Sequence, residues 1–383
     1  MTGALAKTCA MVSVGALLAG HLGAQGSLST QGFGYPQGQL TARALSLGGA
    51  IGEIDPSGPL NPGAIGWLAT RTVVFQMEPE FRTTTSPGGV DRTTTARYPL
   101  ILVGVPFGER WVTSVSSSSL LDRSWATSRA IVELIGTDSV PANLHESSNG
   151  AMNDLRFAEA WTNRSWLSIV VGIHAITGRN GVTSGQDFPD TAFHFASFSS
   201  THTLSYRGTA VSAGVFFTAS DQAVIGVTYR KGGTLRERSN DSTLSQGKAP
   251  DHFGASLAYT GIHGTTFAAR AAHDTWSTMA SLLETPGQTV HDSWDLGGGA
   301  EVTGPHLFSQ TLLLRAGVRT RTLPFEAASK MVTEKSVSFG SGLSLGHGRV
   351  AADITAIHQW RQADIPTVKE RAWTLSFSLT ARP

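Results

Sequence analysis

Histidine, serine and carboxylate side chains are the first places to look for chemistry in this 383-residue chain. Its 12 histidines form neither an H-E-x-x-H motif nor a pair that shares a carboxylate at metal-site spacing. His252 and Ser256 would share one face of a strand, but four residues along a strand separate them by about 13 Å, too far for a nucleophile and its base. A hydrolase assembled from distant residues stays open as an alternative. The sequence predicts no enzyme, no metal site and no cofactor.

Three arginines, Arg315, Arg319 and Arg321, recur at even spacing and would also share one face of a strand. Such a row either lines a path for anions or pairs with carboxylates on neighbouring strands. Pairing is the usual arrangement, because charged side chains away from water are nearly always paired. The candidate partners are Asp295, Glu301 and Asp353. Both interpretations depend on strands that place these side chains.

The last stretch, residues 371–382, gives the clearest strand pattern. Its apolar residues are Trp373, Leu375, Phe377, Leu379 and Ala381, and they alternate with Thr374, Ser376, Ser378 and Thr380. This strict period of two gives a strand one apolar and one hydroxylic face. Similar stretches recur along the chain at a length of about 9–13 residues, and a tilted strand needs about 9–11 to cross a membrane.

After residue 71 the same pattern predicts about fourteen strands, with limits uncertain by two to four residues. The strands are 72–82, 94–107, 111–121, 152–162, 166–178, 203–218, 222–231, 251–260, 264–275, 290–303, 308–322, 332–346, 349–360 and 370–382. Short turns alternate with longer polar connections such as 122–151, 178–201 and 234–250. This alternation is typical of an all-β, transmembrane, antiparallel β-barrel, with both ends of the wall at the short-turn rim.

Charged residues collect on one parity of these strands, which a barrel explains because a charge on the lipid face costs roughly 2–4 kcal/mol at mid-bilayer. The predicted lumen charges are Glu78, Glu80, Arg270, Asp295, Glu301, Arg315, Arg319 and Asp353. Glu159 breaks the parity, which indicates the membrane interface or a bulge, and Gly208 indicates a bulge. Tryptophans are expected in two interfacial girdles, Trp111, Trp161 and Trp166 at one rim and Trp125, Trp276, Trp294, Trp360 and Trp373 at the other.

Residues 1–24 have the pattern of a secretory signal peptide, with Lys7, a short apolar core and a small-residue cleavage site before Gln25. Cys9 lies inside this segment, so the mature chain would contain no cysteine. The absence of a basic tract argues against nucleic-acid binding.

Residues 40–68 resemble the N-terminal motif of the FadL-like outer-membrane proteins, which include long-chain fatty acid transporters and PorV-like proteins. The motif residues are Arg43, Ala44, Leu45, Ser46, Leu47, Gly48, Gly49 and Ala50, then Asp55, then Asn61, Pro62, Gly63 and Ala64. The resemblance implies a plug, residues 25–71, inside a barrel of residues 72–383. Two departures are the Ala-Arg-Pro end, which lacks a terminal aromatic residue, and the shorter external loops.

In the fatty acid transporters a kink in the third strand opens the wall towards the bilayer. The corresponding serines here are Ser114, Ser116, Ser117, Ser118 and Ser119, and Ser116–Ser119 give this strand no apolar face. A weak or kinked wall is therefore expected at this strand. The other interpretation is a polar strand that faces loops or a partner.

The resemblance implies a monomer in the outer membrane of a Gram-negative-type bacterium that takes up hydrophobic, fatty-acid-like molecules by passive diffusion. Its partners would be outer-membrane lipid and the hydrophobic ligand. Two alternatives remain open at this point. One is a PorV-like accessory barrel that engages secretion-system proteins, and the other is a general porin with a polar lumen.

Overall fold

The computed structural model describes residues 28–30, 32–86, 89–136, 138–188, 195–239, 242–283, 289–307, 310–327, 329–346, 348–363 and 368–383. The predicted signal peptide, residues 1–24, and the predicted cleavage site before Gln25 lie outside these residues. Among the described residues, no helix has the length and apolar character needed to cross a membrane.

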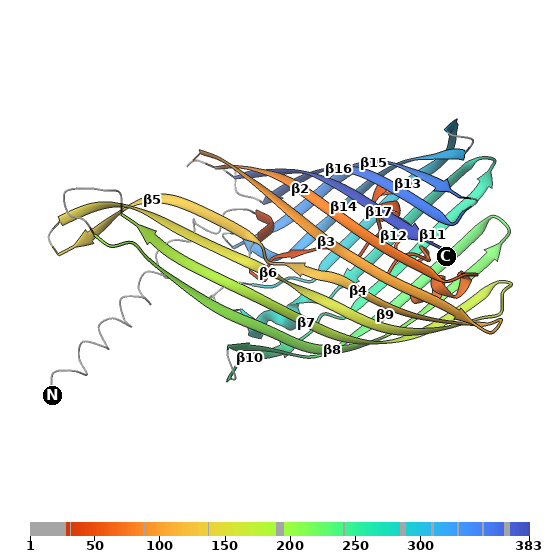
Figure 1. Cartoon of the computed structure of the whole chain (residues 1–383), viewed down its shortest axis with the longest axis horizontal. Helices are drawn as coiled ribbons and strands as arrows, with labels where there is room; N and C mark the ends of the chain where they lie inside the picture. The colour runs from red at the N-terminus through yellow and green to blue at the C-terminus, as the bar shows by residue number, and fades with distance from the viewer. Residues whose placement is uncertain are drawn as a thin grey trace.

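Fourteen strands close into one antiparallel barrel, in which each strand pairs with the next around the wall and β17 pairs with β2 (Figure 1). The wall strands are β2 (Thr72–Ser86), β3 (Gly89–Phe107), β4 (Trp111–Asp122), β6 (Asp138–Thr162), β7 (Leu167–Asp187), β8 (Phe198–Ser220), β9 (Ala223–Ser239), β11 (His252–Ile262), β12 (Thr265–Asp274), β13 (Ser293–Leu307), β14 (Gln310–Ala327), β15 (Lys330–Leu345), β16 (Val350–Ala363) and β17 (Lys369–Ala381). The predicted fold class is confirmed.

Burial alternates along the wall as the period of two requires. On β17, Trp373 and Leu379 are half exposed on the outside, whereas Thr374 and Ser376 are buried inside. An apolar outer face and a polar inner face suit a closed sheet in lipid, because closure satisfies every backbone hydrogen bond without water.

The connections at one rim are short turns, as predicted, and we call this the short-turn rim. At the other rim, the segments predicted as long polar loops, 122–151, 178–201 and 234–250, are mostly strand. They extend β6, β7, β8 and β9 beyond the apolar band and add β5 (Trp125–Ile135) and β10 (Ser242–Lys248). Figure 1 shows the β5–β6 ribbon projecting from this end, which we call the ribbon rim. The loop prediction was wrong because the outward positions of these extensions, such as Arg179, Thr201 and Arg236, are polar, so no apolar alternation marks them.

The structure agrees with some of the local irregularities that the sequence predicts and differs at others. The register of β8 against β9 shifts between Gly208 and Ala210, so the predicted bulge is present. Glu159 lies in a regular ladder near the short-turn rim, where its carboxylate accepts a hydrogen bond of 2.8 Å from Thr113. The girdle prediction was wrong for Trp276, which is buried in a short 3-10 helix, η3 (Trp276–Leu282), inside the ribbon rim.

The segment before the barrel lies inside the lumen. It contains η1 (Leu28–Thr30), β1 (Tyr35–Pro36), α2 (Ala42–Ser46) and η2 (Pro62–Trp67). Leu28 packs against Val332 and Ala363 near the ribbon rim, and Leu68 packs against Leu102 near the short-turn rim. The segment therefore runs down the whole bore before β2 begins, and it occupies the place of a plug.

Candidate functional site

Glycines let the plug backbone touch the wall. Gly48 and Gly49 follow α2 with φ angles of +65° and +82°, a left-handed conformation that favours glycine. A Cβ atom added at Gly297 on β13 would collide with the Gly48 carbonyl oxygen, and one added at Gly317 on β14 would collide with the Gly48 amide nitrogen. The turn after α2 is therefore fitted against the backbone of two wall strands.

The other residues of the predicted plug motif hold the plug together. Thr41 caps α2 by accepting a hydrogen bond from the Ala44 amide and donates one to the Asp55 carboxylate. Asn61 accepts from the Gly63 amide at 2.7 Å and donates to the Glu53 carbonyl oxygen at 2.5 Å, and Pro62 begins η2.

The remaining motif residue, Arg43, faces the wall. Its guanidinium lies 3.7 Å from the Glu301 carboxylate.

A buried ion-pair network lies at the ribbon half of the lumen. Arg361 has no exposed side-chain surface, and its guanidinium nitrogens lie 3.3 Å from Glu80, 2.6 Å from Glu334 and 2.6 Å from Glu370. The ring of Tyr35 from β1 packs on the same guanidinium, with the Arg361 Cζ atom 4.4 Å from the ring centroid. This plug residue therefore inserts into the centre of the wall network.

A second network joins the plug to β12, β13 and β14. Arg270 contacts Glu53 of the plug at 2.9 Å and Asp295 at 2.6 Å, and Arg319 contacts Asp295 at 2.6 Å. Burial raises the pKa of the Glu53 carboxyl, but Arg270 and His252 outweigh this effect and hold the pKa below its usual value. Glu53 is therefore an ionised anchor of the plug at neutral pH.

The other predicted lumen charges also point inward. Arg315 contacts Glu301 and Asp353, each at 2.6 Å, and Glu78 accepts hydrogen bonds from Gln76 and Ser376. Of the two interpretations of the arginine row, the structure shows the paired one, because Arg315, Arg319 and Arg321 each contact a carboxylate.

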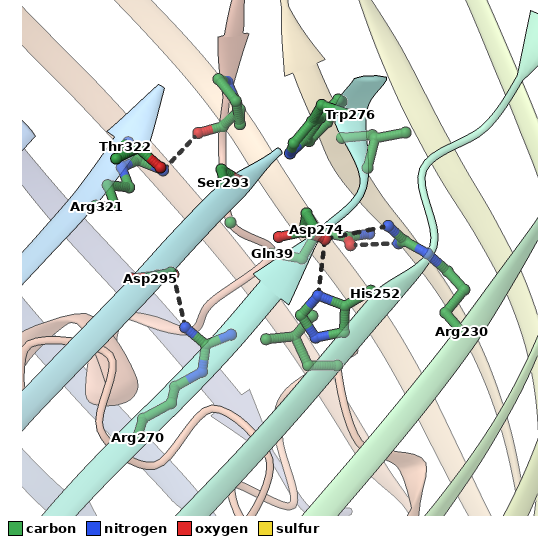
Figure 2. A pocket seen from close by; sticks show the side chains of 14 residues that line it. Gln39, Arg230, His252, Arg270, Asp274, Trp276, Ser293, Asp295, Arg321 and Thr322 are labelled. Atoms are coloured by element: carbon green, nitrogen blue, oxygen red, sulfur yellow. Dashed lines mark hydrogen bonds and ion pairs between the residues drawn. The ribbon is translucent and has the colours of Figure 1, made fainter. Parts of the chain in front are cut away.

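A polar cavity of about 30 Å³ remains between plug and wall. Figure 2 shows Gln39, Arg230, His252, Arg270 and Asp295 around it. Because one water needs roughly 10–15 Å³ by this measure, the cavity has room for only a few water molecules. Passage of a larger molecule through this cavity therefore requires the plug to move.

Towards the ribbon rim, above this polar region, the lumen holds an apolar core, which we call the outer apolar cluster. Phe33 of the plug packs on Tyr206 with ring centroids 6.0 Å apart, and η3 contributes Trp276 and Met279. Its members are Phe33, Leu120, Leu121, Met152, Ile176, Leu204, Tyr206, Ala210, Leu235, Ala249, Trp276, Met279, Leu282, Val290 and Phe325. The other fourteen side chains of this cluster could surround a hydrophobic molecule in place of Phe33.

The wall parts between β3 and β4. Their ladder joins residues 100–107 to 111–118 and stops at the Leu100–Ser118 pair. Beyond that pair, β4 continues against β6 on one side, and its other edge is taken by the plug strand β1, with Tyr35 opposite Asp122 and Pro36 opposite Leu121. Among the described residues, β3 is paired only with β2 from residue 89 to residue 99.

The five serines of the predicted weak strand lie directly below this parting. Ser114, Ser116 and Ser118 are buried on the lumen side, whereas Ser117 and Ser119 are half-buried on the outer side. Ser118 accepts a hydrogen bond of 2.7 Å from Gln39 of the plug. The register of β4 against β6 shifts between Ser119 and Leu121, which bends this edge at the end of the serine run.

Comparison with solved structures shows the same architecture over most of the chain. A FadL homologue from Pseudomonas aeruginosa matches with a TM-score of 0.60 at 12% identity, covering 92% of this chain and 99% of that one. The fold is that of the FadL-type channels. The monoaromatic hydrocarbon channel CymD matches with a TM-score of 0.57 at 13% identity, covering 90% and 97% of the two chains.

The toluene transporter TbuX of Ralstonia pickettii matches this FadL-type barrel with a TM-score of 0.57 at 11% identity, covering 90% of this chain and 98% of that one. No family model matches the sequence, and no curated protein matches it. The relationship is therefore visible in the fold, with its plugged barrel, and hardly at all in the residues.

One hydrogen-bond chain in this FadL-type lumen has the order of a hydrolase triad. Asp154 contacts His174 Nδ1 at 2.8 Å, and His174 Nε2 contacts Ser212 at 2.8 Å. Asp154 also accepts from Gln39 of the plug and from Arg230, and Ser212 does not line the 30 Å³ cavity. The chain ties the plug to β6, β7, β8 and β9, and we interpret it as a structural link.

The described residues contain no group of three or more histidine, cysteine or acidic side chains that could hold a metal ion. Sequence reasoning missed Arg361, Glu334 and Glu370, the centre of the ribbon-half network. The predicted strand ended at residue 360, one residue before Arg361. The period of two could have found Arg361, because it places this residue on the same face of the strand as Asp353 and Gln359.

Proposed function

We propose that this protein carries hydrophobic small molecules passively across the outer membrane, without a cofactor and without catalysis. The parting of β3 from β4 supports this most directly, since a strand of the plug and not a strand of the wall covers the open edge. An apolar solute that reaches this edge meets lipid outside the barrel, so it can leave sideways without crossing the polar bore.

The proposed route begins in the outer apolar cluster and ends at the parting. Leu120 and Leu121 of β4 belong to that cluster, and Leu121 is the partner of Pro36 in the parting itself. A molecule held in the cluster is therefore one strand away from the bilayer once β1 withdraws. The serine run below, from Ser114 to Ser119, would form the lower lip of this opening.

We infer that the ligand is a hydrophobic molecule, as it is for the hydrocarbon channels that this chain resembles in fold. We propose that the mature chain begins near Gln25, after export through a signal peptide, and that it functions as a monomer with residues up to 71 as its plug. The ribbon rim would face the outside of the cell and the short-turn rim the periplasm.

Vesicles that contain the refolded full-length mature chain test this function. We expect them to take up a labelled fatty acid or a labelled alkane faster than empty vesicles do, while small ions do not pass. Rapid ion conductance through a planar bilayer would instead support a general porin. Co-purification with secretion components, without uptake, would support the PorV-like alternative.

A disulfide between plug and wall should block uptake. Pro36 and Leu121 are direct cross-strand partners, so their Cα atoms lie about 4.5–5.5 Å apart, a separation that a disulfide spans. In the variant Pro36→Cys/Leu121→Cys, oxidation should lower uptake to the level of empty vesicles, because β1 can no longer leave the parting. A reductant should restore it.

The two single variants, Pro36→Cys and Leu121→Cys, are the controls and should respond to neither reagent. The chain has only one natural cysteine, Cys9, and it lies in the predicted signal peptide. Undiminished uptake through the fully cross-linked protein would show that solutes do not pass beneath β1.

A further inference from the structure

The outer faces of β7, β8 and β9 are apolar near the middle of the wall and carry basic residues towards the ribbon rim. Ile173, Val211 and Tyr229 are strongly exposed on these strands and belong to the apolar band. Towards the ribbon rim, arginine and lysine occur among the mainly polar outward positions. They are Arg179 on β7, Arg207 on β8, Lys231, Arg236 and Arg238 on β9, and Lys248 on β10.

The strand register brings three of these arginines together. Arg207 is the direct cross-strand partner of Arg236, and Arg179 lies diagonal to Arg207, because Thr177 is the partner of Arg207. Like charges placed opposite each other destabilise a sheet unless something neutralises them. We call Arg179, Arg207 and Arg236 the arginine patch.

Among the described residues, no carboxylate pairs with the arginine patch. The nearby acid, Asp251, is already engaged, with Lys231 at 3.2 Å and Lys248 at 3.1 Å. Arg236 donates one hydrogen bond of 3.3 Å to Gln246, which carries no charge. Within the described part of the chain, the patch therefore presents positive charge on the outside of the wall that no carboxylate balances.

The height of the patch matches the headgroup region of a bilayer. Arg207 is ten residues from Phe217, which lies at the short-turn end of β8. A strand that tilts by about 40° rises about 25 Å over that length, which is the height of the apolar band of such barrels. The patch lies where the apolar band ends and the headgroups of the outer leaflet begin.

We propose that the arginine patch binds the phosphate groups of the glycolipid in the outer leaflet. A guanidinium offers parallel N–H donors that match phosphate oxygens two at a time. The apolar face immediately below, formed by Ile173, Val211 and Tyr229, gives the acyl chains of the same lipid a surface to lie on. A free phosphate ion would use only the upper half of this surface, so the structure favours the lipid.

Lipid binding at the arginine patch rests on one part of the proposed function, the location of the barrel in the outer membrane. It does not depend on the proposed transport route. The two can therefore fail separately. Loss of the arginine patch should leave uptake of a labelled alkane by vesicles unchanged, because the patch lies outside the bore.

The test is lipid binding to the full-length mature chain in detergent, followed by native mass spectrometry. The probes are bisphosphorylated lipid A and the same glycolipid with its phosphates removed. We expect the wild type to prefer the phosphorylated form. In Arg207→Gln/Arg236→Gln that preference should fall by roughly thirtyfold, the effect of removing two cations from a charged membrane surface.

The matched control is Arg110→Gln/Arg349→Gln, which removes two exposed arginines from turns at the opposite rim and should keep the preference. Heat-modifiable migration on gels checks that both variants fold, and Arg179→Gln/Arg207→Gln is the second variant if the first does not. An unchanged preference in a folded patch variant, or equal binding of both lipids by the wild type, overturns the proposal. Displacement of the lipid by an equal concentration of inorganic phosphate also overturns it, because the site would then take free phosphate.

Discussion

Replacement of Gly297 by alanine should open the barrel to ions, whereas the same change at the next residue, Gly298, should not. The Cβ atom of Gly297→Ala would collide with the Gly48 carbonyl oxygen of the plug. Backbone cannot rotate out of the way as a side chain can, so the turn after α2 must leave the wall. At Gly298 the nearest atom to an added Cβ is 3.8 Å away, which is an ordinary contact.

Planar-bilayer conductance measures this effect. We expect Gly297→Ala to raise ion conductance by about tenfold or more, because an unplugged barrel of this size encloses an aqueous bore. Gly298→Ala should match the wild type. A folded Gly297→Ala protein with wild-type conductance would show that the plug can shift without unsealing the lumen. Gly317→Ala, on the neighbouring strand, should behave as Gly297→Ala does.

Replacement of Arg361 by methionine should destabilise the protein strongly. The side chain has no exposed surface, and its loss leaves Glu80, Glu334 and Glu370 buried with less positive charge to balance them. Removing one partner from a buried ion pair typically costs about 3–5 kcal/mol of the free energy of unfolding. Methionine keeps much of the volume, so the lost charge dominates the effect.

Reversible urea unfolding in lipid vesicles gives this free energy. The matched control is Arg371→Met, because Arg371 lies outward on β17 next to Glu370 and is exposed. Its change should be within about 0.5 kcal/mol of the wild type, as for most surface substitutions. Equal unfolding free energies for the two variants would mean that water enters the network and replaces the guanidinium.

The wall could be predicted from the sequence because each strand separates two different solvents. Trp373 and Leu379 face lipid while Thr374 and Ser376 face the bore, so one period of two encodes the strand and its orientation. The ribbons beyond the wall, such as Trp125–Ile135, do not alternate regularly between apolar and polar residues and carry no such signal. Their length could be found only from the structure.

The contacts between side chains in the lumen were harder to predict than which side chains point into it. Parity assigns Glu80 and Arg315 to the inside, but it does not say that Arg361 reaches Glu80 across β17. The path of the plug could not be predicted either, because residues 28–71 have no regular period. Its position depends on close contacts with the wall that only glycines such as Gly297 and Gly317 permit. The role of each predicted site residue in transport stays a prediction.

The closure of the wall between β2 and β17 has a consequence for biogenesis. Val73 and Ala381 are partners although nearly the whole barrel sequence separates them, and the plug that precedes Val73 is enclosed by that seam. The lumen that this seam closes is packed with plug side chains, such as Leu40 and Leu68, that contact the inner face of the wall. We expect the enclosure of the plug to be complete only when the last strand of the chain pairs with β2, because this seam joins the two ends of the barrel sequence.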